Sequence, residues 1–421
     1  APETRQRGIP WVVPAAVLTT VPVWGWALLQ TLPATTLSWL APNPFWAPVL
    51  AQGGLEGVVP LVGLDAAAGL DALMRLLTYA GMFWVVLGLA QDGARARLLL
   101  RVVLIATVAC AVYGLVVQLT GWQVIGWLDK VVYVNDATGT FINRNSFATY
   151  VNIGLMVCLA LLAEPFLEAR GLADVKRIAA QAVAHLLDQK SLLLLSLCVL
   201  AMAALQSHSR GGLLSAGIAV IFVVLLLFLV TRPRPLIVAC VVAATVAVGA
   251  GLLSSSGEVT LERLGQVDAN YDLEVAGRLT FWQVSLDMVA ERPWQGYGYG
   301  SFEAAFAQHR DERFDGVVDK AHNTYIEHLV ELGIPATAAL YLGPVLLFGY
   351  CVRGLFARQR NQVFGLAAAG ATVLVALHSL VDFSLQIPAV AVTFAAVLAI
   401  GVAQSAPSPK RPAQPGASLR D

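Results

Sequence analysis

The segment KAHNTYIEHLVELGIP, residues 320–335, concentrates groups that can exchange protons or bind sugars in a chain that is otherwise mostly apolar. It holds two histidines, His322 and His328, and two carboxylates, Glu327 and Glu331. Histidine is the side chain whose ordinary pKa lies nearest neutral pH, which suits a general base. A histidine on a helix is more often structural than catalytic, so its surroundings have to decide.

The spacing around His322 favours a catalytic role. Ile326 and Leu329 follow it at i+4 and i+7, which places all three residues on one face of a predicted helix. That face is expected to pack toward the membrane body, while the two glutamates point elsewhere. His328 lies about 120° away around the helix and is the weaker candidate.

Three arginines are candidates for binding an anion. Arg210 lies in SHSRGGLLS between two apolar runs, Arg144 lies in FINRNS before another run, and Arg278 begins a predicted helix in a long polar segment. An arginine near a bilayer is often only an interfacial anchor. A guanidinium also matches the geometry of a phosphate better than any other side chain does. We favour the phosphate interpretation for Arg210 and Arg144, because they stand where basic residues are otherwise scarce.

Asn143 and Asn145 flank Arg144 at the start of an apolar run. Asn145 or Ser146 is expected to cap the helix there. A helix N-terminus beside an arginine is also an anion site, so this interpretation stays open beside the cap.

Four further polar residues are expected to support the site. Asn323 and Tyr325 adjoin His322, and His378 and Asp382 stand in LHSLVDFSLQIP at the end of an apolar run. An ionisable pair in that position is costly. It indicates either a structural hydrogen bond or a wall of the active site, and the sequence does not choose between them.

No metal or other cofactor is predicted. The chain has no HExxH, no DxD and no CxxC, and its five cysteines all fall in apolar runs. Lys plus Arg and Asp plus Glu balance at 27 each, so no basic field indicates nucleic acid.

The composition requires a membrane. Apolar residues make up 57% of the 421 residues and charged residues 13%, with a mean hydropathy of +0.70. Soluble domains are about half apolar and a quarter charged. Runs near the ~20 residues that cross a bilayer occur at 11–30, 72–90, 98–118, 146–164, 191–206, 212–231, 236–254, 336–352, 363–380 and 386–403. The broken apolar stretch 41–64 leaves room for two more, so ten to twelve spans are expected.

Basic residues predict the orientation. If the N-terminus is cytoplasmic and the runs alternate, the short outside segments hold few basic residues, among them Lys130 and Arg210, while the inside segments hold many more. This asymmetry is typical of the positive-inside rule. Both termini are therefore predicted to be cytoplasmic. The first run lacks a cleavage motif and is expected to stay as a span.

The connections complete the predicted organisation of one integral-membrane domain, residues 1–421. Residues 165–190 have the spacing of an amphipathic helix in the membrane plane. Residues 255–335 form a long outside loop with its own helices and the candidate site residues, and loops of this kind are usually functional. The tail 404–421 is rich in Pro, Ser and Ala and is expected to be disordered.

The motifs FINRNSFATY, SRGG, ERPWQGYGYGSF, AHNTYIEHLVELGIP and HSLVDFSL occur in this order. In this the chain resembles the bacterial O-antigen ligase family, which also covers O-antigen and exopolysaccharide polymerases. The resemblance spans roughly residues 140–390. It implies an all-α, GT-C-like glycosyltransferase of the bacterial inner membrane with a large periplasmic loop. The family usually has twelve spans, against the ten clear runs here.

The resemblance also implies a reaction. Such enzymes move a glycan from undecaprenyl diphosphate to a sugar hydroxyl, with inversion and without metal. His322 would be the catalytic base, and Arg210 and Arg278 would bind the diphosphate; Arg144 is added on its charge alone. The acceptor would be lipid A–core in a ligase or the growing glycan in a polymerase. A transporter for a lipid-linked polysaccharide is the alternative of another class, but it would place its polar groups near the midplane.

Overall fold

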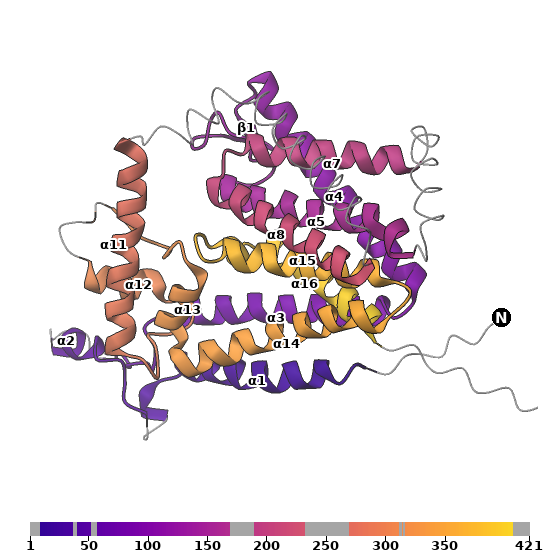
Figure 1. The fold of residues 1–421 in the computed structure, drawn as a ribbon. Helices are drawn as coiled ribbons and strands as arrows, with labels where there is room; N and C mark the ends of the chain where they lie inside the picture. The colour runs from indigo at the N-terminus through magenta and orange to yellow at the C-terminus, as the bar shows by residue number, and fades with distance from the viewer. Residues whose placement is uncertain are drawn as a thin grey trace, which may run out of the picture.

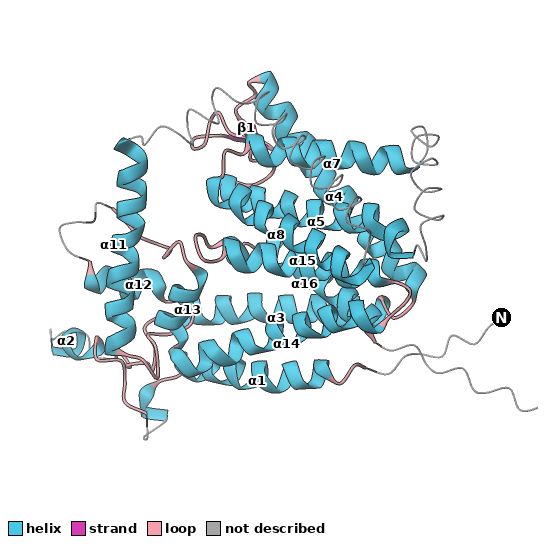
Figure 2. Ribbon diagram, viewed as in Figure 1, coloured by secondary structure: helices cyan, strands magenta, loops and turns pink. Residues whose placement is uncertain are grey.

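The computed structural model describes residues 9–36, 40–51, 57–168, 189–231, 269–310, 314 and 316–406. Helices dominate these residues, and the described strands form one short antiparallel pair (Figure 2). In chain order the elements are α1 (Val12–Gln30), η1 (Ala34–Thr36), α2 (Trp46–Ala51), α3 (Ala66–Leu89), α4 (Gly93–Thr120), β1 (Val124–Ile125), β2 (Leu128–Asp129), α5 (Arg144–Glu168), α7 (Gln189–Gln206), α8 (Arg210–Thr231), α11 (Ala269–Glu291), α12 (Phe302–His309), α13 (Thr324–Leu332), α14 (Ile334–Ala357), α15 (Gln362–His378), η2 (Ser384–Gln386) and α16 (Pro388–Ser405).

Nine described helices correspond to predicted spans. Helices α1, α3, α4, α5, α8, α14 and α16 are long and apolar enough to cross a membrane, and α7 and α15 contain shorter apolar helices. The tenth predicted span, 236–254, lies outside the described residues. The prediction of an all-α polytopic membrane protein is therefore confirmed.

Two predicted segments differ in the structure, and a third lies mostly outside the described residues. In the described parts of 41–64 the only helix is α2, whose six residues extend about 9 Å, far less than the ~30 Å hydrocarbon core. These parts therefore add no further span. The predicted disordered tail begins too early, because Gln404 and Ser405 are buried at the end of α16. Of the predicted amphipathic helix, residues 169–188 lie outside the described residues.

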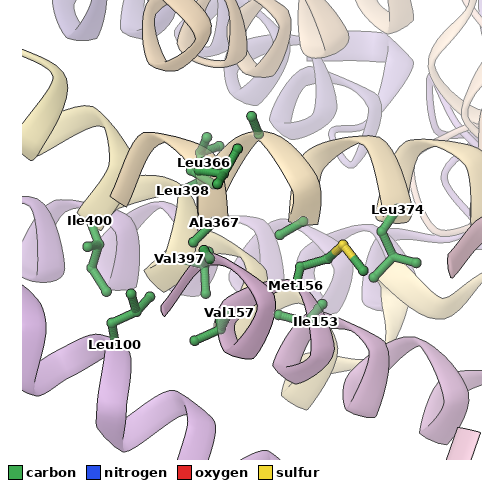
Figure 3. Packing of buried hydrophobic residues seen from close by; sticks show 14 of the residues in the cluster. Leu100, Ile153, Met156, Val157, Leu366, Ala367, Leu374, Val397, Leu398 and Ile400 are labelled. Carbon is green, nitrogen blue, oxygen red and sulfur yellow. The ribbon is translucent and has the colours of Figure 1, made fainter. Parts of the chain in front are cut away.

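The core of the bundle forms around α5, α15 and α16. Within an apolar stretch of 18 residues in each helix, 83% of the residues are buried in α5 and 72% in α16. The corresponding share is 28% in the peripheral helices α1 and α4. Figure 3 shows Ile153 and Met156 of α5 among apolar side chains of α15 and α16. Small residues bring the last two helices together: a Cβ added at Gly401 would lie 2.3 Å from Cβ of Ala368.

Helices α11, α12 and α13 gather at one end of the bundle, and α11 runs across the direction of the spanning helices (Figure 1). Helix α11 ends before Pro293, as the sequence predicts, but it begins at Ala269. Arg278 therefore lies inside α11 and does not begin it. Helix α13 begins at Thr324, after His322.

The first turn of α13 is bonded to the chain that leaves α15. The Thr324 amide donates to the Ser379 carbonyl at 2.9 Å, and the Thr324 hydroxyl donates to the Asp382 carbonyl, also at 2.9 Å. The Tyr325 hydroxyl donates to the Ala376 carbonyl at 2.9 Å. These bonds hold the predicted site segment against the end of a spanning helix.

Candidate functional site

His322 lies just outside α13, in a left-handed backbone conformation with φ of 50°. The next residue, Asn323, is the N-cap, and its side-chain oxygen accepts from the amides of Tyr325 and Ile326 at 3.0 and 3.1 Å. The predicted helical face for His322 is wrong, because the residue precedes the helix. A left-handed histidine is uncommon, and such conformations often occur at functional sites.

The residue before His322 is held from two sides. The indole nitrogen of Trp282 in α11 donates to the Ala321 carbonyl at 3.0 Å. The Glu327 carboxylate accepts from the Ala321 amide at 3.1 Å. The backbone that presents His322 is therefore set by α11 on one side and α13 on the other.

The His322 ring faces Asp382. Its Nδ1 lies 4.0 Å from Oδ1 of Asp382, and its ring centroid lies 5.2 Å from that of Phe383. The His322 side chain is 29% exposed, whereas that of Asp382 is 1% exposed. This distance is too long for a hydrogen bond, so the buried carboxylate acts on the imidazole only as a nearby negative charge.

Both predicted diphosphate-binding arginines approach the same segment. Nη1 of Arg278 donates to the Val381 carbonyl at 3.1 Å. Arg210 is the first residue of α8, and a Cβ on the next residue, Gly211, would lie 2.9 Å from Cγ2 of Val381. The structure thus brings the Arg278 side chain, the start of α8 that contains Arg210, and His322 to residues 378–382.

His378 is buried within this junction. Its Nδ1 lies 2.9 Å from the Thr149 hydroxyl and 3.1 Å from the Ser384 hydroxyl, and the residue is 2% exposed. The sequence left two interpretations open for His378 and Asp382. The geometry favours a structural hydrogen bond for His378, whereas Asp382 lines the site beside His322.

Arg144 belongs to a separate cluster. Its Nη1 donates to Asp136 at 2.8 Å, and its guanidinium lies 5.0 Å from the ring centroid of Tyr133. The other Asp136 oxygen lies 2.7 Å from Nδ1 of His208. Burial raises the pKa of Asp136, but hydrogen bonds from His208 and Arg144 outweigh burial and hold it below its usual range. The charge of Arg144 is therefore balanced by Asp136, in contrast to the expected phosphate contact.

This cluster braces the turn before Arg210 and was missed in the sequence. His208 has a left-handed φ of 51°, and the Ser209 hydroxyl donates to the Asn145 side-chain oxygen at 2.7 Å. The predicted cap is also shifted, because it is Asn143 whose side chain accepts from the Asn145 amide, at 2.7 Å. Asn145 instead joins α5 to the α7–α8 turn. The acidic Asp136 in NDATGT was the available signal.

A second polar cluster contains Lys320, Glu327 and Glu331. Glu327 and Glu331 are only 1% and 3% exposed, so the prediction that they point away from the protein body is wrong. Nζ of Lys320 lies 3.1 Å from Glu327, and the Phe302 amide donates to Glu331 at 3.2 Å. Burial, with the nearby charge of Glu327, raises the pKa of Glu331 to about 8. These groups compensate one another in a largely buried environment.

His328 joins this second cluster as a neutral group. Its Nδ1 lies 2.8 Å from the Tyr341 hydroxyl. Burial lowers its pKa to about 4, and the charge of Lys320 acts in the same direction. A pKa this low makes His328 a weak base, and its bond to Tyr341 gives it a structural role.

An elongated cavity of about 860 Å³ opens beside the second cluster. Its walls come mainly from α1, α3, α14 and α16, and its polar end includes Lys320, Thr324 and Gln386. Arg210, Arg278 and His322 are not among its described lining residues. The cavity therefore reaches the site segment at Lys320 and Thr324, on either side of His322 in the sequence.

These features define a multi-pass helical membrane protein with a polar site where its connecting helices meet one end of the bundle. Residues 193–341 match the O-antigen ligase family. The domain is of the O-antigen ligase and polymerase type. The matched segment contains Arg210, Arg278 and His322 but neither Arg144 nor Asp382. No curated protein matches the chain significantly.

The raised pKa of Glu331 predicts how stability depends on pH. The folded state keeps the Glu331 proton up to about pH 8, whereas the unfolded state releases it near pH 4.5. The free energy of unfolding should therefore fall as pH rises through this window. Glu331→Gln should make the fall shallower in thermal unfolding of the solubilised chain. Glu303→Gln, at an exposed position, is the control; an unchanged slope in Glu331→Gln would contradict the assignment.

Proposed function

We propose that the protein transfers a glycan from undecaprenyl diphosphate to a sugar hydroxyl at the periplasmic face of the bacterial inner membrane. The observation that supports this is the approach of Arg210, Arg278 and His322 to one segment, residues 378–382. Two fixed cations and one base are what a displacement with a diphosphate leaving group needs. The proposed topology keeps both termini in the cytoplasm.

The arginines have the electrostatic role. Negative charge grows on the diphosphate as the glycosidic bond breaks, and preorganised guanidinium groups stabilise that charge most where water is excluded. Arg278 is oriented by the Val381 carbonyl. Arg210 stands at the N-terminus of α8, where the helix dipole adds to its positive charge.

His322 has the role of general base. The acceptor oxygen forms a bond to the anomeric carbon as that carbon loses its bond to the diphosphate oxygen, and the hydroxyl proton passes to His322. Direct displacement inverts the anomeric configuration. The Asp382 carboxylate, 4.0 Å from Nδ1, would stabilise the imidazolium that forms. Diphosphate needs no proton to leave, so one base suffices.

For the acceptor we propose lipid A–core, which makes the protein an O-antigen ligase. A polymerase that extends a lipid-linked glycan would use the same donor and the same three residues. A transporter is disfavoured, because the candidate residues gather at one end of the bundle, whereas transporters bind their cargo near the midplane.

His322→Ala should abolish transfer while leaving the chain folded. Loss of a general base costs about 10²–10⁴-fold in rate. The measurement is glycan transfer by purified protein from undecaprenyl-diphosphate-linked glycan to lipid A–core. His309→Ala is the control, since the His309 ring contacts Glu291 at 3.0 Å and the Ala305 carbonyl at 2.8 Å, away from residues 378–382 in the sequence. More than about a tenth of the wild-type rate in His322→Ala would be inconsistent with this role.

Lysine in place of either Arg210 or Arg278 keeps the charge but loses the forked donor. Each substitution should lower kcat/KM for the donor by at least about tenfold, the effect of one charge-assisted hydrogen bond. Arg310→Lys, an exposed change in the same loop, should be neutral. The convergence of the two arginines on one diphosphate fails as an explanation if either variant keeps the wild-type kcat/KM.

Transfer should survive EDTA, because in this proposal the arginines neutralise the diphosphate. Among the described residues, His, Cys, Asp and Glu side chains form no group of three or more that could hold a metal. The measurement compares initial rates with and without chelator, followed by added magnesium or manganese. Loss of transfer in EDTA and its return with either cation would show that a metal shares the role.

A further inference from the structure

The elongated cavity has the length of a lipid chain. Its lining on α3 runs from Ala68 to Val85. Those 17 steps (85 − 68) correspond to about 26 Å of helix, close to the ~30 Å thickness of a hydrocarbon core. Most of its wall residues are apolar side chains of spanning helices. An extended apolar chain fits this shape.

The polar end of the cavity lies at the segment that carries His322. Lys320 and Thr324 both line it, and they stand two residues to either side of His322. Thr324 is also bonded to the Ser379 and Asp382 carbonyls. A lipid whose chain lies in the cavity therefore has its head group beside the proposed base.

The charges at this end do not suit a diphosphate. Both lining cations have acidic partners: Lys320 lies 3.1 Å from Glu327, and Arg75 forms an ion pair with Asp71. Glu331 lines the same end. Tyr299, Tyr341 and Gln386 complete it with hydroxyl and amide groups, a set that suits the hydroxyls of a saccharide better than a doubly charged leaving group.

The position of the arginines gives the direction of attack. Arg210 and Arg278 belong to α8 and α11, and neither helix contributes a described residue to the cavity. An inverting displacement requires the attacking hydroxyl and the leaving diphosphate on opposite sides of the anomeric carbon. If the diphosphate lies with the arginines, the cavity remains for the lipid that carries the attacking hydroxyl.

We propose that the cavity between α1, α3, α14 and α16 holds an apolar chain of the lipid that carries the acceptor glycan. The inference rests on the proposed function and adds the location of the second substrate. The donor lipid then approaches from the α8 and α11 side. The two membrane-bound substrates meet at His322 from opposite directions.

Two glycines of α3 provide a matched pair of variants. Gly81 lines the cavity, Gly88 does not, and a Cβ added at either meets no atom within 4 Å. Gly81→Phe should lower kcat/KM for rough lipopolysaccharide by at least about tenfold, since loss of two buried methylene groups already has that effect. Gly88→Phe should behave like the wild type.

Two further measurements distinguish a specific effect on acceptor binding in the cavity from a general loss of protein function. The KM for undecaprenyl-diphosphate-linked donor should stay unchanged in Gly81→Phe. Transfer to core oligosaccharide freed of lipid A should also be unchanged, because that acceptor has no chain to exclude. A raised donor KM, an equal loss with the lipid-free acceptor, or an unchanged kcat/KM for rough lipopolysaccharide would each overturn the proposal.

Cross-linking tests occupancy without relying on transfer. A photo-reactive amino acid in place of Gly81 should cross-link rough lipopolysaccharide and not undecaprenyl diphosphate, and the same amino acid in place of Gly88 should cross-link neither above background. Capture of undecaprenyl diphosphate alone, or of neither lipid, would refute the assignment. Capture of rough lipopolysaccharide by the photo-reactive Gly81 variant, together with no glycan transfer by the wild-type protein, would instead refute the proposed function.

Discussion

The two hydrogen bonds from Thr324 to the Ser379 and Asp382 carbonyls determine where the site forms. They join the first turn of α13, in the long connection between α8 and α14, to the chain that leaves α15. These bonds help to bring His322 close to Asp382, although the two residues are 60 positions apart in the sequence (382 − 322). Because the acceptors are backbone carbonyls at the end of a spanning helix, the bonds also set the depth of the site relative to the bundle.

The same junction separates two kinds of charge. On one side, Arg210 and Arg278 approach residues 378–382 from α8 and α11. On the other, Lys320 is balanced by buried Glu327. A segment of about five residues thus divides a region suited to an anion from a nearly neutral region that opens to an apolar cavity. This division is the physical argument for the proposal that two substrates approach one base from different sides.

The left-handed backbone at His322 and the buried carboxylate of Glu327 are both unfavourable in isolation. Neighbouring groups stabilise each of them. The left-handed backbone of His322 is held by Trp282 and Glu327 through the two polar groups of Ala321. Glu327 can be buried because Lys320 and the Ala321 amide meet its charge. Removal of one partner would leave an uncompensated buried charge, which is strongly destabilising.

The sequence by itself determined the fold class and the helices, because apolar runs of bilayer length can form only spanning helices. It also singled out Arg210, Arg278 and His322 by residue type and motif. It misplaced Glu327, Glu331 and Arg144, since helical spacing cannot tell which polar residues find buried partners. Asp136 balances Arg144 and Ser379 anchors α13 through contacts between segments distant in the chain. Only the tertiary structure decided these pairings, because they depend on how the helices pack.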